Sequence, residues 1–98
     1  MPRRPPDLDG PRARAVLERA RRVPRGHVAA YGDLDSAAPR FAGTVLAACE
    51  DPSIPWHRIV RADGTLTQGS RQAALLQHEG VAIEDGRVDV RRARWWSP

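Results

Sequence analysis

The chain has 98 residues and a formal net charge of +4 at pH 7. That length predicts one domain with a thin core, since a chain of this size buries only about 60–65% of its unfolded surface. No apolar run approaches the ~20 residues that a membrane-spanning helix needs, and no apolar stretch follows the basic N-terminus as it would in a secretory signal. We therefore expect a cytoplasmic protein without a membrane partner, and its basic balance suits a polyanion such as nucleic acid.

The first ten residues are rich in proline and arginine, which predicts an irregular segment ahead of a domain over 11–98. A helix is predicted from Pro11, because proline suits the first helical position, and Pro24 with Gly26 should end it. Its apolar residues recur at the spacing of one buried helical face. They are Ala13, Val16, Leu17, Ala20 and Val23.

Residues 27–31 are short and β-leaning, and two helices are predicted after them, over 32–37 and from Pro39 to about residue 50. Two short helices joined by a tight turn resemble a helix-turn-helix. The second helix has an apolar face made of Phe41, Ala42, Val45, Leu46 and Cys49. Its other face carries Arg40, Gly43, Thr44 and Ala47. Apart from the arginine those side chains are small, so this face can approach another surface closely.

Residues 51–60 are expected to be extended, because residues that precede proline avoid the helical region. Asp63-Gly64 then predicts a turn before a short β-leaning run over 65–67. Ser70 is expected to cap a helix over 71–79, and Gly80 has the position of a helix-terminating glycine.

The C-terminal part predicts a β-hairpin, in which 81–83 and 87–90 flank Asp85-Gly86. A basic tail over 91–94 leads to Trp95 and Trp96. The expected fold is therefore mainly α with small β elements, a winged helix-turn-helix-like DNA-binding domain with a C-terminal hairpin.

The single cysteine, Cys49, excludes an internal disulfide and a multi-cysteine metal site. The three histidines show no spacing typical of metal ligands, so we predict no metal and no cofactor. Because Cys49 falls on an apolar helical face, an inert packing role is expected for it.

Four segments of this chain, in this order, resemble the DNA-binding domain of the O6-alkylguanine-DNA alkyltransferases, over about residues 12–83. They are Val23-Pro24-Arg25-Gly26-His27-Val28 with Tyr31-Gly32-Asp33-Leu34, then Arg40 to Gly43, then Pro55-Trp56-His57-Arg58-Ile59-Val60, and Leu75-Leu76-Gln77-His78-Glu79-Gly80. In the active enzymes of that family the central motif reads Pro-Cys-His-Arg, and its cysteine takes the alkyl group. Here the residue is Trp56, whose indole has no ionisable thiol and cannot act as the nucleophile. Pro-Trp-His-Arg in a short chain is similar to the alkyltransferase-like proteins.

That resemblance implies a non-enzymatic protein that binds O6-alkylguanine in duplex DNA and flips the damaged nucleotide into a pocket. It also implies a monomer that flags the lesion for nucleotide excision repair proteins and is nucleoid-associated while bound to DNA. Two other functions stay open. One is an active alkyltransferase that uses another acceptor, with Cys49 as the candidate. The other is a winged-helix transcription regulator that reads sequence in the major groove.

The resemblance implies a lesion pocket formed by Tyr31, Trp56, Ile59, Gly69 and Ser70. Trp56 would be a wall of the pocket, and the main-chain carbonyls of Trp56 and Ile59 would accept from the guanine amino group. Tyr31 would crowd the target phosphate. The outer loop over 66–70 is shorter than in the enzymes, which would leave room for bulkier alkyl groups.

The second helix would contact DNA through Arg40, Gly43, Thr44 and Ala47. The resemblance implies that Arg40 enters the duplex and fills the space of the flipped base, while the small residues lie against the minor groove. The turn over 33–39 is several residues shorter than usual for the family, which leaves the register of this helix open.

His57 and Glu79 match the proton-relay pair of the enzymes. Without the cysteine, a hydrogen bond between them is expected to be structural and to hold the pocket loop. Arg58 is expected to tie segments together. Trp95 and Trp96 have two open interpretations, as a cap on the core or as a lid on the lesion pocket.

Overall fold

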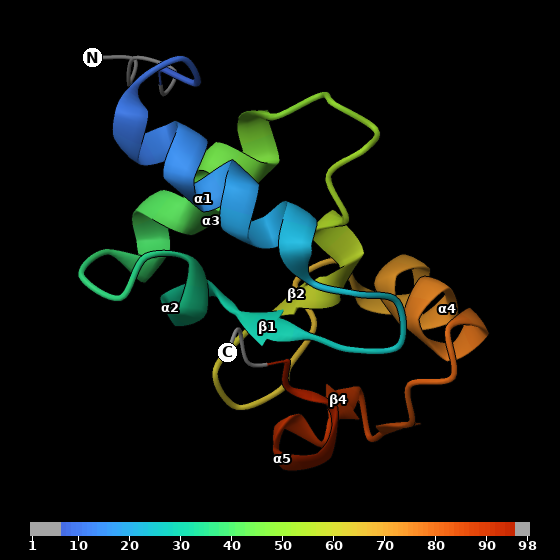
Figure 1. The fold of residues 1–98 in the computed structure, drawn as a ribbon. Coiled ribbons are helices and arrows are strands. Elements are labelled where there is room, and N and C mark those ends of the chain that lie inside the picture. The colour runs from blue at the N-terminus through green and yellow to red at the C-terminus, as the bar shows by residue number, and fades with distance from the viewer. Residues whose placement is uncertain (1–6, 96–98) are drawn as a thin grey trace.

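The computed structural model describes residues 7–95, and Figure 1 shows their arrangement. In chain order the elements are α1 (Pro11–Arg22), β1 (Ala29–Ala30), α2 (Tyr31–Leu34), α3 (Pro39–Ala48), the 3-10 helix η1 (Trp56–Arg58), β2 (Ile59–Val60), α4 (Gly69–His78), β3 (Ile83–Glu84), β4 (Arg87–Val88) and α5 (Val90–Ala93). This confirms the predicted fold class, mainly helical with small β elements. None of the helices within 7–95 has the length and apolar character that crossing a membrane requires.

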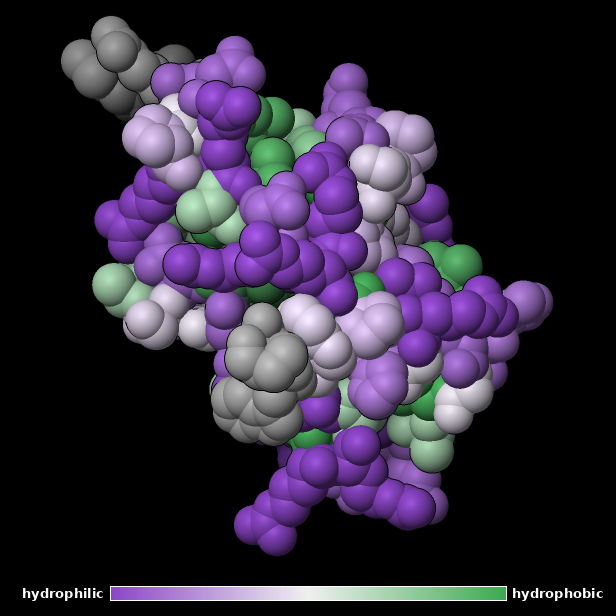
Figure 2. Space-filling model, in the orientation of Figure 1, coloured by the Kyte–Doolittle hydropathy of each residue, from purple (hydrophilic) through white to green (hydrophobic). Residues whose placement is uncertain are grey.

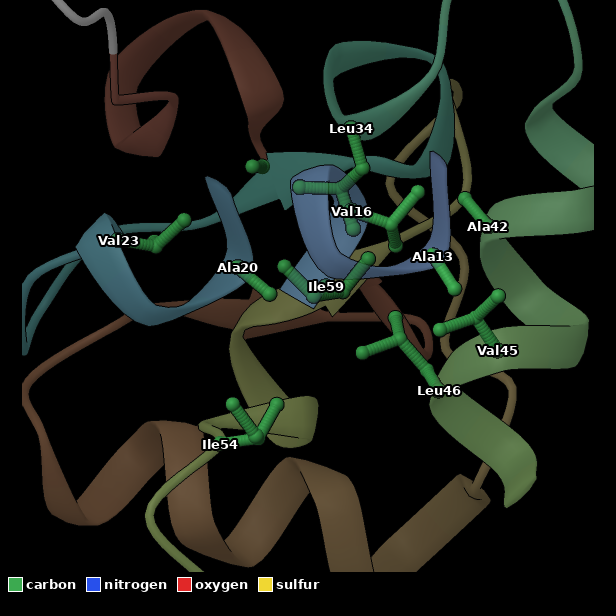
Figure 3. Close-up of a cluster of buried hydrophobic side chains, with 11 residues drawn as sticks. Ala13, Val16, Ala20, Val23, Leu34, Ala42, Val45, Leu46, Ile54 and Ile59 are labelled. Atoms are coloured by element: carbon green, nitrogen blue, oxygen red, sulfur yellow. The ribbon is translucent and has the colours of Figure 1, made fainter. Parts of the chain in front are cut away.

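Helix α1 packs against α2 and α3, and its apolar face lies at the centre of the larger core cluster (Figure 3). Pro11 opens the helix as predicted, and the chain leaves the helical conformation at Val23. The buried side chains of this cluster come from α1, β1, α2, α3 and β2, and from the segments after α1 and before η1. Figure 3 labels Ala13, Val16, Ala20, Val23, Leu34, Ala42, Val45, Leu46, Ile54 and Ile59. The period of the apolar residues in α1 and α3 therefore predicted which faces are buried.

The helix-turn-helix consists of α2, a tight turn and α3. Tyr31 is the first residue of α2, although the sequence pattern placed it in an extended segment. Helix α2 also ends earlier than predicted, at Leu34, because Asp35 takes an extended conformation. The carboxylate of Asp35 then accepts from the backbone N–H of Ala38 at 3.1 Å, which closes the turn just before Pro39 opens α3.

Strands β1 and β2 form a parallel pair in which Ala29 lies opposite Ile59 and Ala30 opposite Val60. Trp56 was expected to lie in extended chain, but it begins η1. The turn of η1 aligns the chain with β1, because Arg58 N–H bonds to the carbonyl of Pro55 at 3.0 Å and pairing begins directly afterwards. A pairing between such distant segments has no local signal in the sequence.

The C-terminal half packs around a second buried cluster of Val28, Val60, Leu76, Val81 and Val88. The predicted hairpin is present: Asp85 has φ of 50° and Gly86 φ of 74°, the positive pair that a tight two-residue turn requires. At Gly64 a side chain is excluded, because an added Cβ would lie 2.1 Å from the carbonyl oxygen of Val88.

The segment expected as a basic tail is instead α5 and its continuation. Trp95 N–H donates to the carbonyl of Val28 at 2.8 Å, and the Trp95 side chain packs against the larger core cluster. This confirms the core-cap interpretation for Trp95. The predictions for Trp96 and for residues 1–6 of the N-terminal segment lie outside the described residues.

Candidate nucleic-acid interface

A cavity of about 570 Å³ opens where α3, η1 and the loop before α4 come together. Its lining combines aromatic, small and basic side chains. They are Tyr31, Pro39, Arg40, Gly43, Leu46, Ala47, Cys49, Trp56, Arg61, Thr67, Gln68 and Arg71. The cavity thus brings together residues from α2 to the start of α4, which are distant in the sequence.

Helix α3 turns small residues to the cavity, together with Leu46 and Cys49 of its apolar face. The resemblance had assigned the small-residue face to the DNA and not to the pocket. Gly43 lies against Tyr31, because a Cβ added at Gly43 would lie 3.7 Å from two carbons of the ring. Ala47 and the exposed Arg40 also line the cavity. Thr44 is exposed beside this face, and its hydroxyl donates to the carbonyl of Arg40 at 3.0 Å.

Tyr31 spans the cavity from α2 to the loop that precedes α4. Its hydroxyl lies 3.0 Å from the hydroxyl of Thr67, and its ring packs against the larger core cluster. The half-buried tyrosine therefore has an apolar body on the core and a polar tip at the rim.

Trp56 lies at the start of η1 and is half-buried. The guanidinium carbon of Arg71 lies 5.2 Å from the centroid of its ring, within the range of a cation–π contact. The ring of His57 meets Trp56 edge to face, with 5.9 Å between centroids. The indole is therefore held between two neighbours while it lines the cavity.

Three residues predicted for the pocket do not line the cavity. Ile59 is fully buried in the larger core cluster, and its carbonyl already accepts from Nε2 of Gln72 at 2.8 Å. Gly69 and Ser70 are exposed in the first turn of α4, which begins two residues before its predicted start, so Ser70 is not the cap. The rim is formed instead by Thr67 and Gln68, which precede Gly69 and Ser70, and by Arg71, which follows them.

Seven residues of the cavity lining were not predicted as pocket or DNA-binding residues. They are Pro39, Leu46, Cys49, Arg61, Thr67, Gln68 and Arg71. Thr67 and Gln68 lie in the loop that the sequence already placed at the outer edge of the pocket. Arg71 is the residue after that loop. The sequence could have indicated it only through its position at the predicted start of the following helix. Arg61 follows β2 directly, and nothing in its neighbourhood distinguished it from other arginines.

Gln72 fixes the rim of the cavity at Thr67 and Gln68 through hydrogen bonds from its buried side chain. Its side chain is fully buried, and its Oε1 accepts from the backbone N–H groups of Thr67 and Gln68, each at 3.1 Å. Its Nε2 donates to the carbonyls of His57 and Ile59, at 3.0 and 2.8 Å. All four hydrogen-bonding positions of the amide are used, so one side chain ties the rim loop to η1 and β2.

Glu79, at the end of α4, connects this helix to η1 and to the segment that follows α1. Its carboxylate accepts from Nε2 of His57 at 2.7 Å, from Nη2 of Arg58 at 2.9 Å and from the N–H of Gly26 at 3.2 Å. Arg58 also donates to the carbonyl of Val23 at 3.0 Å. The structure thus contains the predicted His57–Glu79 hydrogen bond, with Arg58 tying the end of α1 to it. Burial would raise the pKa of Glu79, but the hydrogen bonds from Arg58 and His57 lower it to about 2.

Cys49 lies at the C-terminal end of α3, half-buried, and it lines the same cavity as Trp56. A nucleophilic thiol is activated by a hydrogen bond to an adjacent base. Within residues 7–95 no such bond joins the sulfur of Cys49 to the His57–Glu79 pair. The same residues contain no group of three or more His, Cys, Asp or Glu side chains placed to hold a metal ion.

Comparisons with known proteins agree with this geometry. The family described as "6-O-methylguanine DNA methyltransferase, DNA binding domain" matches residues 11–81. A protein of Escherichia coli (strain K12) named DNA base-flipping protein is 37% identical over 86 residues, which cover 74% of this chain and 65% of that protein. A bifunctional methyltransferase/endonuclease of Picrophilus torridus is 32% identical over 83 residues, which cover 28% of that longer protein.

The fold resembles that of S. pombe Atl1, solved in complex with damaged DNA containing O6-carboxymethylguanine. The two share a TM-score of 0.76 and 22% sequence identity, over 86% of this chain and 94% of that one. A second structure, of S. pombe ATL in complex with DNA, has a TM-score of 0.70 at 23% identity. The chain therefore belongs to the family of the 6-O-methylguanine DNA methyltransferase DNA-binding domain.

Proposed function

We propose that this protein binds duplex DNA that carries O6-alkylguanine and receives the flipped, damaged base in the cavity beside Trp56, without transferring the alkyl group. The position of Trp56 carries the proposal. Its indole lines the cavity and, unlike a cysteine thiolate, cannot act as the nucleophile that accepts an alkyl group. The name of the E. coli relative and the damaged DNA bound to Atl1 support it. This chain spans only 65% of the E. coli relative, so the activity of the whole relative enters here as part of the proposal.

The lining suits a flipped base. Such a base needs aromatic or apolar walls and a few hydrogen-bond partners, and Trp56, Tyr31 and the rim residues Thr67 and Gln68 supply both. The guanidinium of Arg71 on Trp56 adds a positive charge at the wall, which favours the electron-rich face of a purine.

The duplex would lie along α3. Its small face allows close approach to a groove, and Arg40, which is exposed near the start of the helix, would occupy the gap that a flipped base leaves. Extruding a base costs a few kcal/mol, so a side chain that fills the gap lowers the cost of flipping. The same proposal has the protein act as a monomer in the cytoplasm, nucleoid-associated while bound, and pass the lesion to nucleotide excision repair.

The proposal is tested by comparing two duplexes of one sequence, one with O6-methylguanine and one with guanine at the same position, at one salt concentration. We expect tighter binding to the alkylated duplex. A third duplex with a larger O6-alkyl group tests the room at the shortened rim. Equal affinity for all three duplexes contradicts the proposal, and sequence-selective binding to undamaged DNA would instead favour a winged-helix regulator.

We predict that Arg40→Ala weakens binding to the alkylated duplex by about 1–3 kcal/mol, the scale of one good specific DNA contact. The reason is that the gap left by the flipped base is no longer filled. Arg92→Ala, an exposed substitution on α5, removes the same charge away from the cavity and serves as the control. Equal losses in the two variants would mean that Arg40 contributes only general charge.

A transferase that uses Cys49 is a second candidate, because Cys49 lines the cavity. We predict that the protein mass stays unchanged after incubation with excess alkylated duplex, since within residues 7–95 no hydrogen bond links Cys49 to the His57–Glu79 pair. Intact mass spectrometry measures this, with Cys49→Ala as the control. An added alkyl mass that disappears in Cys49→Ala would replace the binding-only proposal with a transferase.

A further inference from the structure

Three consecutive residues at the end of α2 are each held by an arginine from elsewhere in the chain. Arg94 donates through Nε to Oδ2 of Asp33 at 3.0 Å. Arg19 donates to the carbonyl of Leu34 at 2.6 Å, and Arg12 donates to Asp35. Two of these arginines lie on α1 and the third follows α5, so the two ends of the described chain meet at α2.

Helix α2 cannot hold its own position. It has four residues, and isolated helices shorter than about 12 residues are marginal even in favourable sequences. Its place must therefore come from tertiary contacts. Tyr31, which spans the cavity, is its first residue, so the same contacts decide where the tyrosine ring lies.

Arg12 makes the most extensive of these contacts. It binds Asp35 with both arms of its fork, Nε to Oδ2 at 2.7 Å and Nη2 to Oδ1 at 3.1 Å. Its guanidinium also lies 5.4 Å from the centroid of Phe41, the third residue of α3. The bound Asp35 is 8% exposed and accepts from the N–H of Ala38. Arg12 thus links α1 to the turn and to the residue next to Arg40.

The sign of the charges favours the same arrangement. An aspartate carboxyl is ionised at neutral pH, and the hydrogen bond from Arg12 lowers the pKa of Asp35 further. An unpaired carboxylate at this turn would repel DNA phosphates, and Arg12 neutralises it.

We propose that Arg12, Arg19 and Arg94, the α2 clamp, are positioning residues that hold Tyr31 and the start of α3 in the geometry needed for base flipping. This proposal rests on the proposed function. The turn between α2 and α3 is short, and the α2 clamp supplies contacts from outside the helix-turn-helix that fix the position of α2. It acts through Asp35 and α2, and needs no contact of its own with the DNA.

Helix α1 offers a matched control. Arg12 and Arg19 are seven residues apart, two helical turns, and share the flank that faces α2. Arg14 and Arg21 are also seven apart and occupy the opposite flank, where Arg21 pairs with Glu18 and Asp51. Figure 2 shows mostly hydrophilic residues on the face that α1 occupies. Replacing Arg12 or Arg14 therefore removes the same charge from the same helix, but only Arg12 belongs to the α2 clamp.

The test measures the ratio of affinities for alkylated and undamaged duplex. In Arg12→Ala we expect this ratio to fall about tenfold, while Arg14→Ala keeps the wild-type ratio and loses affinity for both duplexes alike. Arg12→Lys keeps the charge but cannot form the fork, so its ratio should fall as well. A wild-type ratio in Arg12→Lys, or equal ratios in Arg12→Ala and Arg14→Ala, would overturn the proposal. If Arg12→Ala does not fold, Arg12→Lys decides.

Hydrogen exchange without DNA separates this proposal from the proposed function. We expect Arg12→Lys to increase exchange at the amides of residues 35–42, compared with wild type and Arg14→Ala. Unchanged exchange there overturns the α2 clamp whatever the DNA result. A wild-type protein without lesion preference overturns the proposed function alone, and the exchange result still decides whether the α2 clamp positions α2 and α3.

Discussion

Replacing Glu79 with alanine is expected to lower the free energy of unfolding by about 3–5 kcal/mol, the cost of removing one partner from a buried ion pair. The Glu79 side chain is 6% exposed, and Arg58, His57 and Gly26 all donate to it. Without the carboxylate, Arg58 keeps a charge that is 19% exposed and has lost its counter-ion. Small domains have unfolding free energies of only about 5–15 kcal/mol, so this loss would be a large fraction of the total.

Urea denaturation followed by circular dichroism measures this loss. Glu50→Ala is the control, since Glu50 is an exposed carboxylate. We expect a change within about 0.5 kcal/mol for that surface substitution. If Glu79→Ala were no less stable than Glu50→Ala, the network around Glu79 would not be the structural link between α1, η1 and α4.

The same carboxylate predicts a pH dependence. The pKa of Glu79 lies at about 2 in the folded protein, below its ordinary value of 4.5, so the unfolded chain binds the proton more readily. The stability from this group is therefore fully present above about pH 4.5 and is lost as the pH falls toward 2. The loss amounts to at most about 3 kcal/mol. Asp33 and Asp35 also have lowered pKa values, so the difference between wild type and Glu79→Gln isolates the contribution of Glu79. If the two proteins lose stability in parallel over this range, Glu79 is not the group responsible.

The second large effect is expected for Gln72→Leu, at about 2–4 kcal/mol of unfolding free energy, because buried polar groups that lose a partner are costly. Leucine has a similar size but leaves the N–H groups of Thr67 and Gln68 and the carbonyls of His57 and Ile59 without the amide. The rim loop should then move, and lesion affinity should fall beyond what the loss of folded protein explains.

Thermal unfolding and DNA binding at a temperature where the variant stays folded measure the two effects. Gln77→Leu is the matched control, since Gln77 is exposed on the same helix. If Gln72→Leu lost stability but kept the wild-type lesion affinity per folded molecule, Gln72 would support the fold without shaping the rim of the cavity.

Local signals in the sequence were sufficient for the helices that carry an apolar period. Pro11 and the spacing from Ala13 to Ala20 predicted α1, and the contrast between the two faces of α3 predicted which side lies in the core. The hairpin followed from Asp85-Gly86, because a two-residue turn with positive φ angles accepts few other residues.

Elements held by distant partners were predicted less well. Helix α2 and η1 are too short to have a period, and their bounds depend on Asp35, Arg58 and the pairing of β1 with β2. Ile59 illustrates the limit, because the motif assigned its main-chain carbonyl to the guanine amino group, while in the structure that carbonyl accepts from the buried amide of Gln72.

What the sequence by itself determined is the chemistry: an indole at position 56 between a proline and a His-Arg pair, and an arginine before a run of small residues on a helix. These are properties of residue type and of spacing within one element. Only the tertiary structure decided that Arg71 lies on Trp56, that Gln72 holds the rim and that Arg12, Arg19 and Arg94 meet at α2. Each of these contacts joins separate elements, and such contacts depend on how the chain packs, which no local pattern records.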